Sequence, residues 1–490
     1  MLQMMGYMKY AAAVLGASSC AACGGNAVEV LPREEVSVFS SSDAGLERAY
    51  SWAREMALSY VHDGGDLVGL WYEAALPQRE AFCMRDVSHQ SVGAHILGLA
   101  AHNKNMFGRF VSNISEGRDW CSYWEINRYD KPAPVDYASD DAFWYNLNAN
   151  FDVMQACLKM YAWTGDMDYI AGDAFAEFYD RTAADYVARW MLEPENVMRR
   201  PRHMNSPAEF DPANMFHTCR GLPSYVENFG GLTMSADLLA AMYAGFAARA
   251  DMAALRGDAA AETGARRMAE EYRTILNDKW WDAEKTRYQT FLSEDGTFHR
   301  GEGVPFILWF GAADGDRVDA AVRDILAREW NVENMSAFPA LFYRLGYGEE
   351  AYSFLTRLPD VNRCEYPEVS YGVIEGVVSG AMGIEPARDG SLLNTCSRMA
   401  GEVEMRIDNM PFRDGYVSVV HDGGSATELE NRTGGAIVWR ASFLGDCSGV
   451  KVGRRNADEV STWSDPRGNT VTSVTVEVPA GRTVRVEAER

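Results

Sequence analysis

The sequence predicts a mainly α protein: an (α/α)6 toroid of six helical hairpins, followed by a small all-β sandwich domain. About a dozen stretches between residues 44 and 382 place apolar residues at helical spacing, with Gly or Pro turns between them. From about Glu402 the pattern changes to alternating strands such as Tyr416-Val-Ser-Val-Val, with Asp-Gly-Gly and Pro-Ala-Gly turns. We therefore expect a leader over 1–25, a helical domain over 40–385 and a β domain over 395–490.

The helical elements follow in order along the chain. Ser42-Asp43 precedes an apolar pattern to about Val61 and is expected to cap that helix. Similarly, Ser139-Asp140-Asp141 is expected to start a long helix that runs through Phe143 to Tyr161. The remaining helices are expected at about 87–110, 173–190, 232–255, 259–277, 303–313, 315–329, 336–346, 348–358 and 370–382. Because the connections of such hairpins alternate between two ends, the long loops would gather at one mouth.

The N-terminus predicts export. Lys9 precedes a short apolar run, followed by small residues before Cys20 and Cys23. This pattern resembles a bacterial lipoprotein leader, and the alternative is an ordinary cleaved signal peptide. We expect a periplasmic or outer-membrane-tethered bacterial lipoprotein, in contact with the membrane only through an N-terminal lipid anchor.

The bulk composition limits the partners. The formal net charge of −24 over 490 residues argues against nucleic acid or an anionic membrane surface, because both require a basic face. A few local arginines could still bind an anionic substrate. The cysteines after the leader show no CxxC or Cys/His spacing, so we expect no metal site, no cofactor and no disulfide framework. The oligomeric state does not follow from the sequence.

The stretch from Trp71 to Gln90 concentrates charge and aromatic rings between two helical patterns. Pro77 makes it a loop that leads into a helix. A loop of this composition is expected to line a site, and the alternative is a surface loop whose charges pair with one another.

Several motifs in the chain resemble the six-hairpin glycosidase superfamily, near its bacterial α-L-rhamnosidase-like and β-glucuronidase-like members. They are Arg79-Glu-Ala-Phe-Cys-Met-Arg-Asp-Val-Ser-His-Gln90, Asp141-Ala-Phe-Trp144 with Tyr161-Ala-Trp-Thr-Gly-Asp166, Arg363-Cys-Glu-Tyr-Pro-Glu-Val-Ser-Tyr371 and Gly383-Ile-Glu-Pro386. The resemblance covers most of residues 40–490. It implies a glycan or oligosaccharide substrate and an exo-acting glycoside hydrolase that inverts the anomeric centre.

Inverting hydrolysis requires one protonated carboxyl group as general acid and one ionised carboxylate as base, far enough apart to admit a water molecule. Glu227, in the aromatic loop Leu222-Pro-Ser-Tyr-Val-Glu227, is the candidate for the acid. Glu368, beside Pro367, is the candidate for the base, although an acidic residue in the first turn of a helix is the alternative. Asp86 is a third catalytic candidate or a helix cap.

Other residues are candidates for substrate binding. Glu125 lies in an apolar setting and could instead pair with Arg118 or Arg128; Asp141 could be a cap; Glu302 lies between glycines and could be a turn residue. Aromatic rings that could stack on a sugar are Trp124, Trp144, Tyr225, Tyr366 and Tyr371.

Arg79, Arg85 and His89 form the one basic cluster of the acidic chain. Two arginines can bind a carboxylate, which favours a uronic acid such as a β-glucuronide over an α-L-rhamnoside. If these arginines pair with Glu80 and Asp86, that preference disappears. His89 could also serve as a structural hydrogen-bonding group.

Two other classes of function remain open on sequence grounds. A polysaccharide lyase or unsaturated uronyl hydrolase could use a related toroid, with Tyr371, His89 and Arg85 as the lyase set. A non-catalytic glycan-binding lipoprotein could rely on the β domain alone, although the carboxylates in the loops argue against it.

Overall fold

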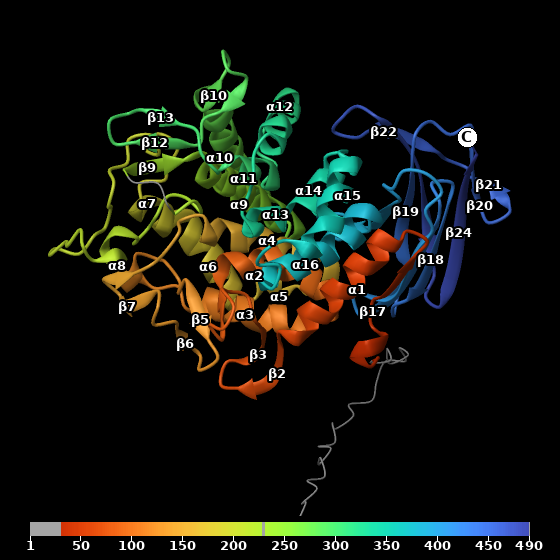
Figure 1. Ribbon diagram of the computed structural model, residues 1–490, viewed down its shortest axis with the longest axis horizontal. Coiled ribbons are helices and arrows are strands. Elements are labelled where there is room, and N and C mark those ends of the chain that lie inside the picture. Colours follow the sequence, from red (N-terminus) through yellow and green to blue (C-terminus); the bar gives the residue numbers. More distant parts are fainter. Residues whose placement is uncertain (1–30, 228–230, 490) are drawn as a thin grey trace, which may run out of the picture.

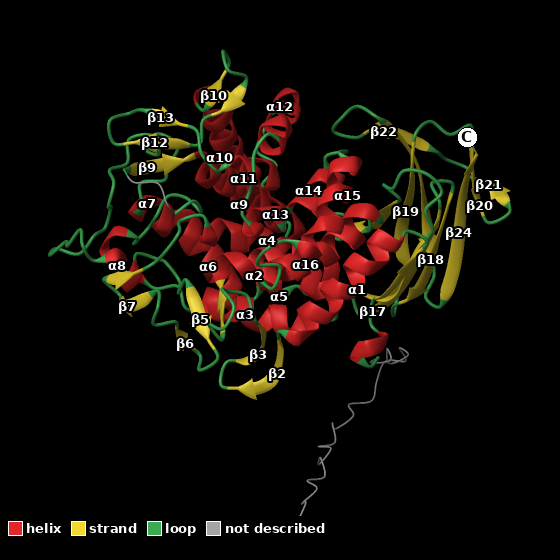
Figure 2. Ribbon diagram, in the orientation of Figure 1, coloured by secondary structure: helices red, strands yellow, loops and turns green. Residues whose placement is uncertain are grey.

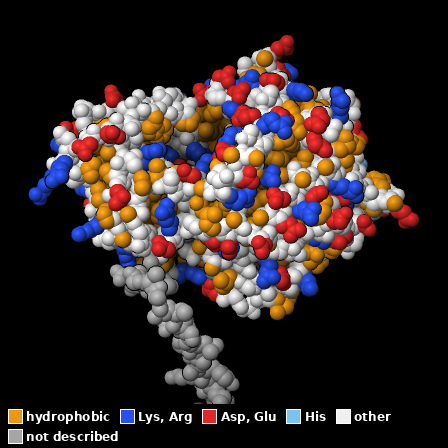
Figure 3. Space-filling view, turned by 180° about the vertical axis from the view of Figure 1, so that it is seen from behind, with side chains coloured by type: hydrophobic (Ala, Val, Ile, Leu, Met, Phe, Trp, Pro, Cys, Tyr) orange, Lys and Arg blue, Asp and Glu red, His pale blue; other side chains and the backbone are white. Residues whose placement is uncertain are grey.

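The computed structural model describes residues 31–227 and 231–489, so the predicted leader with Cys20 and Cys23 lies outside the described residues. A helix-rich body occupies most of the molecule, and a β-sandwich-like region lies at one side of it (Figures 1 and 2). This confirms the mainly helical class and the predicted change from helices to strands near residue 402. On the face in Figure 3, acidic, basic and hydrophobic side chains are interspersed around a hollow.

The helical body is built from helices that pack side by side. Its longer helices are α1 (Ala44–Ser59), α2 (Met84–Ile96), α3 (Ala100–Ser112), α4 (Ala149–Thr164), α6 (Asp173–Arg181), α9 (Ala236–Leu255), α10 (Ala259–Lys279), α11 (Val304–Trp309), α12 (Gly315–Leu326), α14 (Phe338–Arg344), α15 (Gly348–Arg357) and α16 (Pro367–Glu375). Contacts run in succession from α14 to α16, α2, α4, α9 and α11. This succession fits the inner ring of a toroid, and its closure stays a prediction.

The local signals explain several of these helices. Asp43 caps α1 as predicted, with its carboxylate accepting a hydrogen bond from the Leu46 N–H at 2.9 Å. Helix α9 is long and apolar enough to cross a membrane by length and composition, but 67% of that stretch is buried inside the structure. Its apolar character therefore fits a helix of the protein core.

Two helix predictions are wrong. The expected helix from Ser139 is a hairpin of β7 (Tyr137–Ser139) and β8 (Ala142–Phe143), and α4 begins only at Ala149. The expected single helix over 87–110 is interrupted at Gly98, whose φ of 83° is unfavourable for other residues and ends α2 before α3 begins.

The C-terminal region contains two sheets. A seven-stranded sheet has the order β1-β16-β17-β18-β24-β20-β21, and a five-stranded sheet has the order β14-β15-β19-β23-β22. Their strands are β1 (Val38–Ser41), β14 (Glu385–Pro386), β15 (Leu393–Cys396), β16 (Met405–Phe412), β17 (Gly415–Asp422), β18 (Ala426–Arg432), β19 (Ile437–Leu444), β20 (Gly449–Val452), β21 (Arg455–Asn456), β22 (Ser461–Ser464), β23 (Thr470–Val478) and β24 (Arg482–Glu489). Strand β1 precedes the helical body, yet it pairs with β16.

Short strands shape the loops between the helices. They are β2 (Val61–Asp66), β3 (Gly69–Tyr72), β4 (Ala81–Cys83), β5 (Glu125–Asn127), β6 (Lys131–Pro132), β9 (Leu232–Ser235), β10 (Trp281–Asp282), β11 (Arg287–Tyr288), β12 (Phe291–Ser293) and β13 (Phe298–His299). Strand β4 pairs with β5 in the register Cys83↔Glu125, which brings the start of α2 beside the loop that contains Glu125. The predicted aromatic loops thus acquire fixed positions.

Candidate active site

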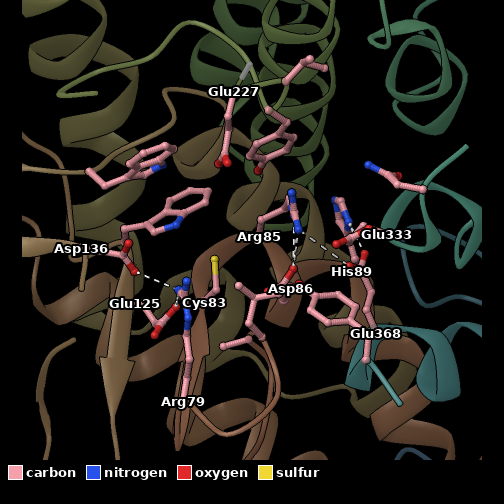
Figure 4. A pocket seen from close by; sticks show the side chains of 18 of the residues that line it. Arg79, Cys83, Arg85, Asp86, His89, Glu125, Asp136, Glu227, Glu333 and Glu368 are labelled. Atoms are coloured by element: carbon pink, nitrogen blue, oxygen red, sulfur yellow. Dashed lines mark hydrogen bonds and ion pairs between the residues drawn. The ribbon is translucent and has the colours of Figure 1, made fainter. Parts of the chain in front are cut away.

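A pocket of about 630 Å³ opens in the helical body beside β4 and β5. Its wall combines segments from α2, β5, the loop before β9, the start of α11 and the start of α16 (Figure 4). Twelve of the residues proposed from the sequence line it: Arg79, Arg85, Asp86, His89, Trp124, Glu125, Trp144, Tyr225, Glu227, Glu302, Tyr366 and Glu368. The fold therefore brings together candidates that are almost 300 positions apart in the chain.

Two proposed binding residues lie elsewhere, which corrects the sequence interpretation. Tyr371 is fully buried, and its hydroxyl donates to the Ala57 carbonyl at 3.0 Å. Asp141 is exposed in the β7–β8 turn and does not line the pocket. Tyr371 points away from the pocket because it lies on the α1-facing side of α16, where its ring packs against Tyr72. It cannot reach a substrate in the pocket.

Arg85 and Asp86 form one buried group at the bottom of the pocket. The Arg85 side chain donates to Asp86 Oδ1 from Nη2 at 2.9 Å, and the Tyr366 hydroxyl donates to Asp86 Oδ2 at 3.0 Å. Asp86 is the third residue of α2 and does not cap it; the N-cap position belongs to Cys83. Burial raises the pKa of Asp86 to about 6, against the opposing charge of Arg85. Both oxygens of Asp86 are thus occupied by protein donors.

Glu368 lies beside this group with one oxygen available. Its Oε1 lies 3.1 Å from His89 Nδ1, and its Oε2 lies 3.9 Å from Arg85 Nη2. Oε2 is buried and has no hydrogen-bond partner among the described residues, although Glu368 lines the pocket. A water molecule or a sugar hydroxyl would satisfy this oxygen.

His89 lies between two carboxylates. Its Nε2 is 2.9 Å from Asp152 Oδ2, on the side opposite to Glu368. Burial lowers the pKa of His89, but the Asp152 and Glu368 carboxylates outweigh it and raise that pKa to about 9. His89 is therefore a cation at neutral pH. The aromatic ring of Trp309 packs against it with a centroid separation of 5.1 Å.

Glu227 reaches into the pocket from the opposite side, above Arg85 and Asp86 (Figure 4). Its side chain is exposed, yet desolvation by the surrounding groups raises its pKa, and the charge of Arg85 opposes this rise. The loop that carries it is fixed by Asp237, whose carboxylate accepts the Tyr225 N–H at 2.8 Å and the Ser224 hydroxyl at 3.0 Å. These bonds fix Ser224 and Tyr225, which directly precede Val226 and Glu227 in the loop.

A third cluster occupies the wall near β5. Arg79 Nη1 donates to Glu125 Oε2 at 2.8 Å and lies 3.5 Å from Asp136 Oδ2. Burial and the nearby Asp136 raise the pKa of Glu125 to about 8. Glu125 therefore pairs with Arg79, and not with Arg118 or Arg128 as considered from the sequence. Glu80 instead pairs with Arg128 at 2.5 Å.

The sequence interpretation missed several residues of this site. Asp136 and Glu333 line the pocket, and Glu333 pairs with Arg363 at 2.7 Å. Asp152, buried beneath the pocket, has the apolar neighbours Phe151 and Val153 in the sequence and was included in a helical core pattern. Only its charge within that apolar run could have marked it, since a buried carboxylate requires partners.

The helix-rich body with a β-sandwich-like region is comparable, as a fold class, with solved glycosidase structures. Solved structures support this class. The chain resembles a GH78 family rhamnosidase of Bacillus sp. GL1 (TM-score 0.55, 11% identity) over 80% of this chain and 40% of that one. It also resembles the α-L-rhamnosidases of Dictyoglumus thermophilum (TM-score 0.56, 12% identity) and Aspergillus terreus (TM-score 0.54, 13% identity), each over 93% of this chain and 50% of that one.

At these identities the likeness shows the fold, and it confirms the resemblance to six-hairpin glycosidases at that level. The chain spans 40 to 50% of the length of these rhamnosidases. No protein-family profile and no curated protein matches the sequence.

Proposed function

We propose that the protein is an exo-acting glycoside hydrolase that removes a terminal sugar with inversion, with Glu227 as general acid and Glu368 as general base. The observation that carries this proposal is the placement of Glu227 and Glu368 on opposite walls of one pocket (Figure 4). Glu227, with its raised pKa, would protonate the leaving oxygen. Glu368, beside the cations His89 and Arg85, would deprotonate water with its available oxygen.

A neutral terminal sugar fits the charges of the pocket better than a uronic acid. Seven carboxyl side chains and three arginines line it, and each arginine already contacts a carboxylate. An anionic sugar would have to displace one of these carboxylates. The rhamnosidase fold neighbours make α-L-rhamnoside the first substrate to test. A uronide is the second candidate, with the more exposed Arg363 as its partner.

The test is a panel of aryl glycosides that includes the α-L-rhamnoside and the β-glucuronide, with NMR identification of the first-formed anomer. The expected result is release of a neutral sugar with inverted configuration. A retained configuration would contradict the roles of Glu227 and Glu368. A rise in ultraviolet absorbance on uronate polymers would indicate a lyase, although Tyr371 of the lyase set lies outside the pocket. An unchanged sugar after long incubation would support a glycan-binding protein.

A further inference from the structure

Asp152 is a buried carboxylate that the hydrolysis proposed above does not use. It lies on α4, is 2% exposed and does not line the pocket. Its Oδ2 is 2.9 Å from His89 Nε2 and accepts a hydrogen bond from the Tyr225 hydroxyl at 2.9 Å. One oxygen atom thus contacts two side chains. The first, His89, contacts Glu368, and the second, Tyr225, lies in the loop that carries Glu227.

The first of these contacts concerns the charge beside Glu368. An imidazole ring between two carboxylates satisfies both only when both of its nitrogens carry a proton, because an ionised carboxylate accepts hydrogen bonds and donates none. The charged and titratable groups that face His89 are Asp152 on α4, Glu368 and Glu375 on α16, Arg85 and Asp86 on its own helix, and the Tyr225 hydroxyl. Carboxylates outnumber cations in this set, which favours the imidazolium form.

The second contact concerns the loop that carries Glu227. Tyr225 precedes Glu227 by two residues and is buried, with its backbone N–H held by Asp237 and its hydroxyl held by Asp152. Its ring also lies under the Arg85 guanidinium, 5.8 Å from the ring centroid. The orientation of Tyr225 therefore limits where the following residues of the loop can lie.

We propose that Asp152 is a positioning residue that couples the two catalytic carboxyl groups: it holds His89 as a cation beside Glu368 and anchors Tyr225 in the loop of Glu227. In this arrangement Asp152 touches no substrate. Its carboxylate keeps a proton on His89, and the imidazolium then donates from Nδ1 to Glu368 Oε1 across 3.1 Å. The inference rests on the proposed function for its effect on turnover, whereas the charge state of His89 can be tested without any substrate.

The substrate-free test is an NMR titration of protein with isotopically labelled histidine. The chain has eight histidines, so His89→Gln assigns the His89 signal by its disappearance. In the native protein the His89 signal should titrate near pH 9. In Asp152→Asn, which preserves the size of the side chain, it should titrate at least about one pH unit lower, because a carboxylate is lost. Tyr225→Phe should leave the titration nearly unchanged, since it removes only a hydroxyl.

The second test measures kcat/KM against pH for the aryl glycoside that the native enzyme cleaves. In Asp152→Asn His89 loses its proton at a lower pH than in the native protein, because the carboxylate at its Nε2 is lost. The alkaline limb of the profile should therefore move to lower pH, by about one unit, and kcat should fall on the order of 10²-fold. Tyr225→Phe should lower kcat without moving that limb. A purely structural role of Asp152 would lower activity with an unchanged limb and would overturn the proposal.

The charge state of His89 and the effect of Asp152 on turnover can be refuted separately. A native His89 that titrates at or below its ordinary pKa of 6.5 overturns the inference even if Asp152→Asn does not fold. If instead His89 titrates near pH 9 and shifts in Asp152→Asn, the charge coupling is supported. Full activity of Glu368→Gln in that case would refute the catalytic assignment of Glu368 and, with it, the effect on turnover, while the His89 result would stand.

Discussion

The Arg79 guanidinium lies 2.8 Å from the Glu125 carboxylate and 3.5 Å from that of Asp136, so one cation stands between two buried acids. Burial and Asp136 raise the pKa of Glu125 to about 8, which leaves this cluster with more protons than two ordinary carboxylates hold at neutral pH. Arg79 therefore already binds two carboxylates of the protein. The cluster of Arg79, Glu125 and Asp136 forms one wall of the pocket, and the net charge of this cluster changes with pH.

Arg79→Ala should destabilise the protein more at pH 8.5 than at pH 6. At pH 8.5 the variant leaves an ionised Glu125 beside Asp136 without a counter-ion. At pH 6 Glu125 is already protonated, so removal of Arg79 costs less stability. We expect a loss of about 2 kcal/mol in the free energy of unfolding at the higher pH. Urea denaturation at both pH values measures it. Arg109→Ala, which removes a half-exposed pair with Asp130, should cost less than about 1 kcal/mol at both.

Glu368→Gln should reduce turnover by at least about 10³-fold while the protein remains folded. The amide keeps the shape of the side chain but cannot take a proton from water. Activity on the aryl glycoside and circular dichroism measure the two properties. Glu365→Gln is the matched control, because Glu365 lies three residues away, is exposed and does not line the pocket. Near-native rates of Glu368→Gln would remove it from the catalytic pair.

Glu227→Gln should also abolish turnover, but its effect should depend on the leaving group. Substrates with good leaving groups need little protonation, so an activated aryl glycoside should retain more activity than a natural glycoside. Comparing the two substrates measures this difference. Glu209→Gln, an exposed residue earlier in the same loop, is the control and should behave as the native protein. An equal loss on both substrates would contradict the role of acid.

The stability of the protein should fall as the pH rises from about 6.5 to 9. His89 has a folded pKa of about 9 and an ordinary pKa of 6.5, so its stabilising contribution is complete below pH 6.5 and is lost as the pH rises through 9. Glu125 acts in the same direction, since its pKa is raised from 4.5 to about 8. Chemical denaturation at pH 6, 7.5 and 9 measures the trend. His89→Gln should flatten it; a stability that rises with pH would contradict both assignments.

Gly221→Ala should disorder the loop that leads to Glu227. Gly221 has a φ of 73°, and a Cβ there would lie 2.2 Å from the ring of the buried Trp190. We expect a loss of more than about 2 kcal/mol in stability and a strong loss of activity. Gly257→Ala is the control: its φ is also 73°, but no atom lies within 4 Å of the added Cβ, so it tests backbone strain alone at about 1 kcal/mol. Equal losses of stability in the two variants would show that the Trp190 ring moves aside for the added Cβ.

Local signals predicted the parts of the fold that depend on neighbours in sequence. Asp43 as a cap and the apolar run of α9 are of this kind. The same rule failed at Ser139-Asp140-Asp141, because Asp140 pairs with Arg118 at 2.9 Å and supports a hairpin, a tertiary contact that spacing does not reveal. Likewise, helical spacing continued across Gly98, where only the backbone conformation marks the break.

The site could be predicted as a set of residue types but not as a set of partners. Charged and aromatic loops marked Arg79, Glu227 and Glu368, and these three residues line one pocket; their roles stay predictions. The pairing of Arg79 with Glu125 depends on the register of β4 against β5, which no local pattern fixes. Tyr371 was misplaced because its position relative to Glu368 on α16 turns it toward α1.

The pairing of β1 with β16 has a consequence for the order of folding. Val38 lies opposite Asp408 and Ser41 opposite Met405, so the edge of the seven-stranded sheet joins residues that are separated by the whole helical body. Such contacts have a high contact order, and the loop they close must be formed before they stabilise anything. We therefore expect the helices to assemble first and this edge to close last, so that a chain truncated before residue 405 would expose an unpaired strand and would be prone to aggregation.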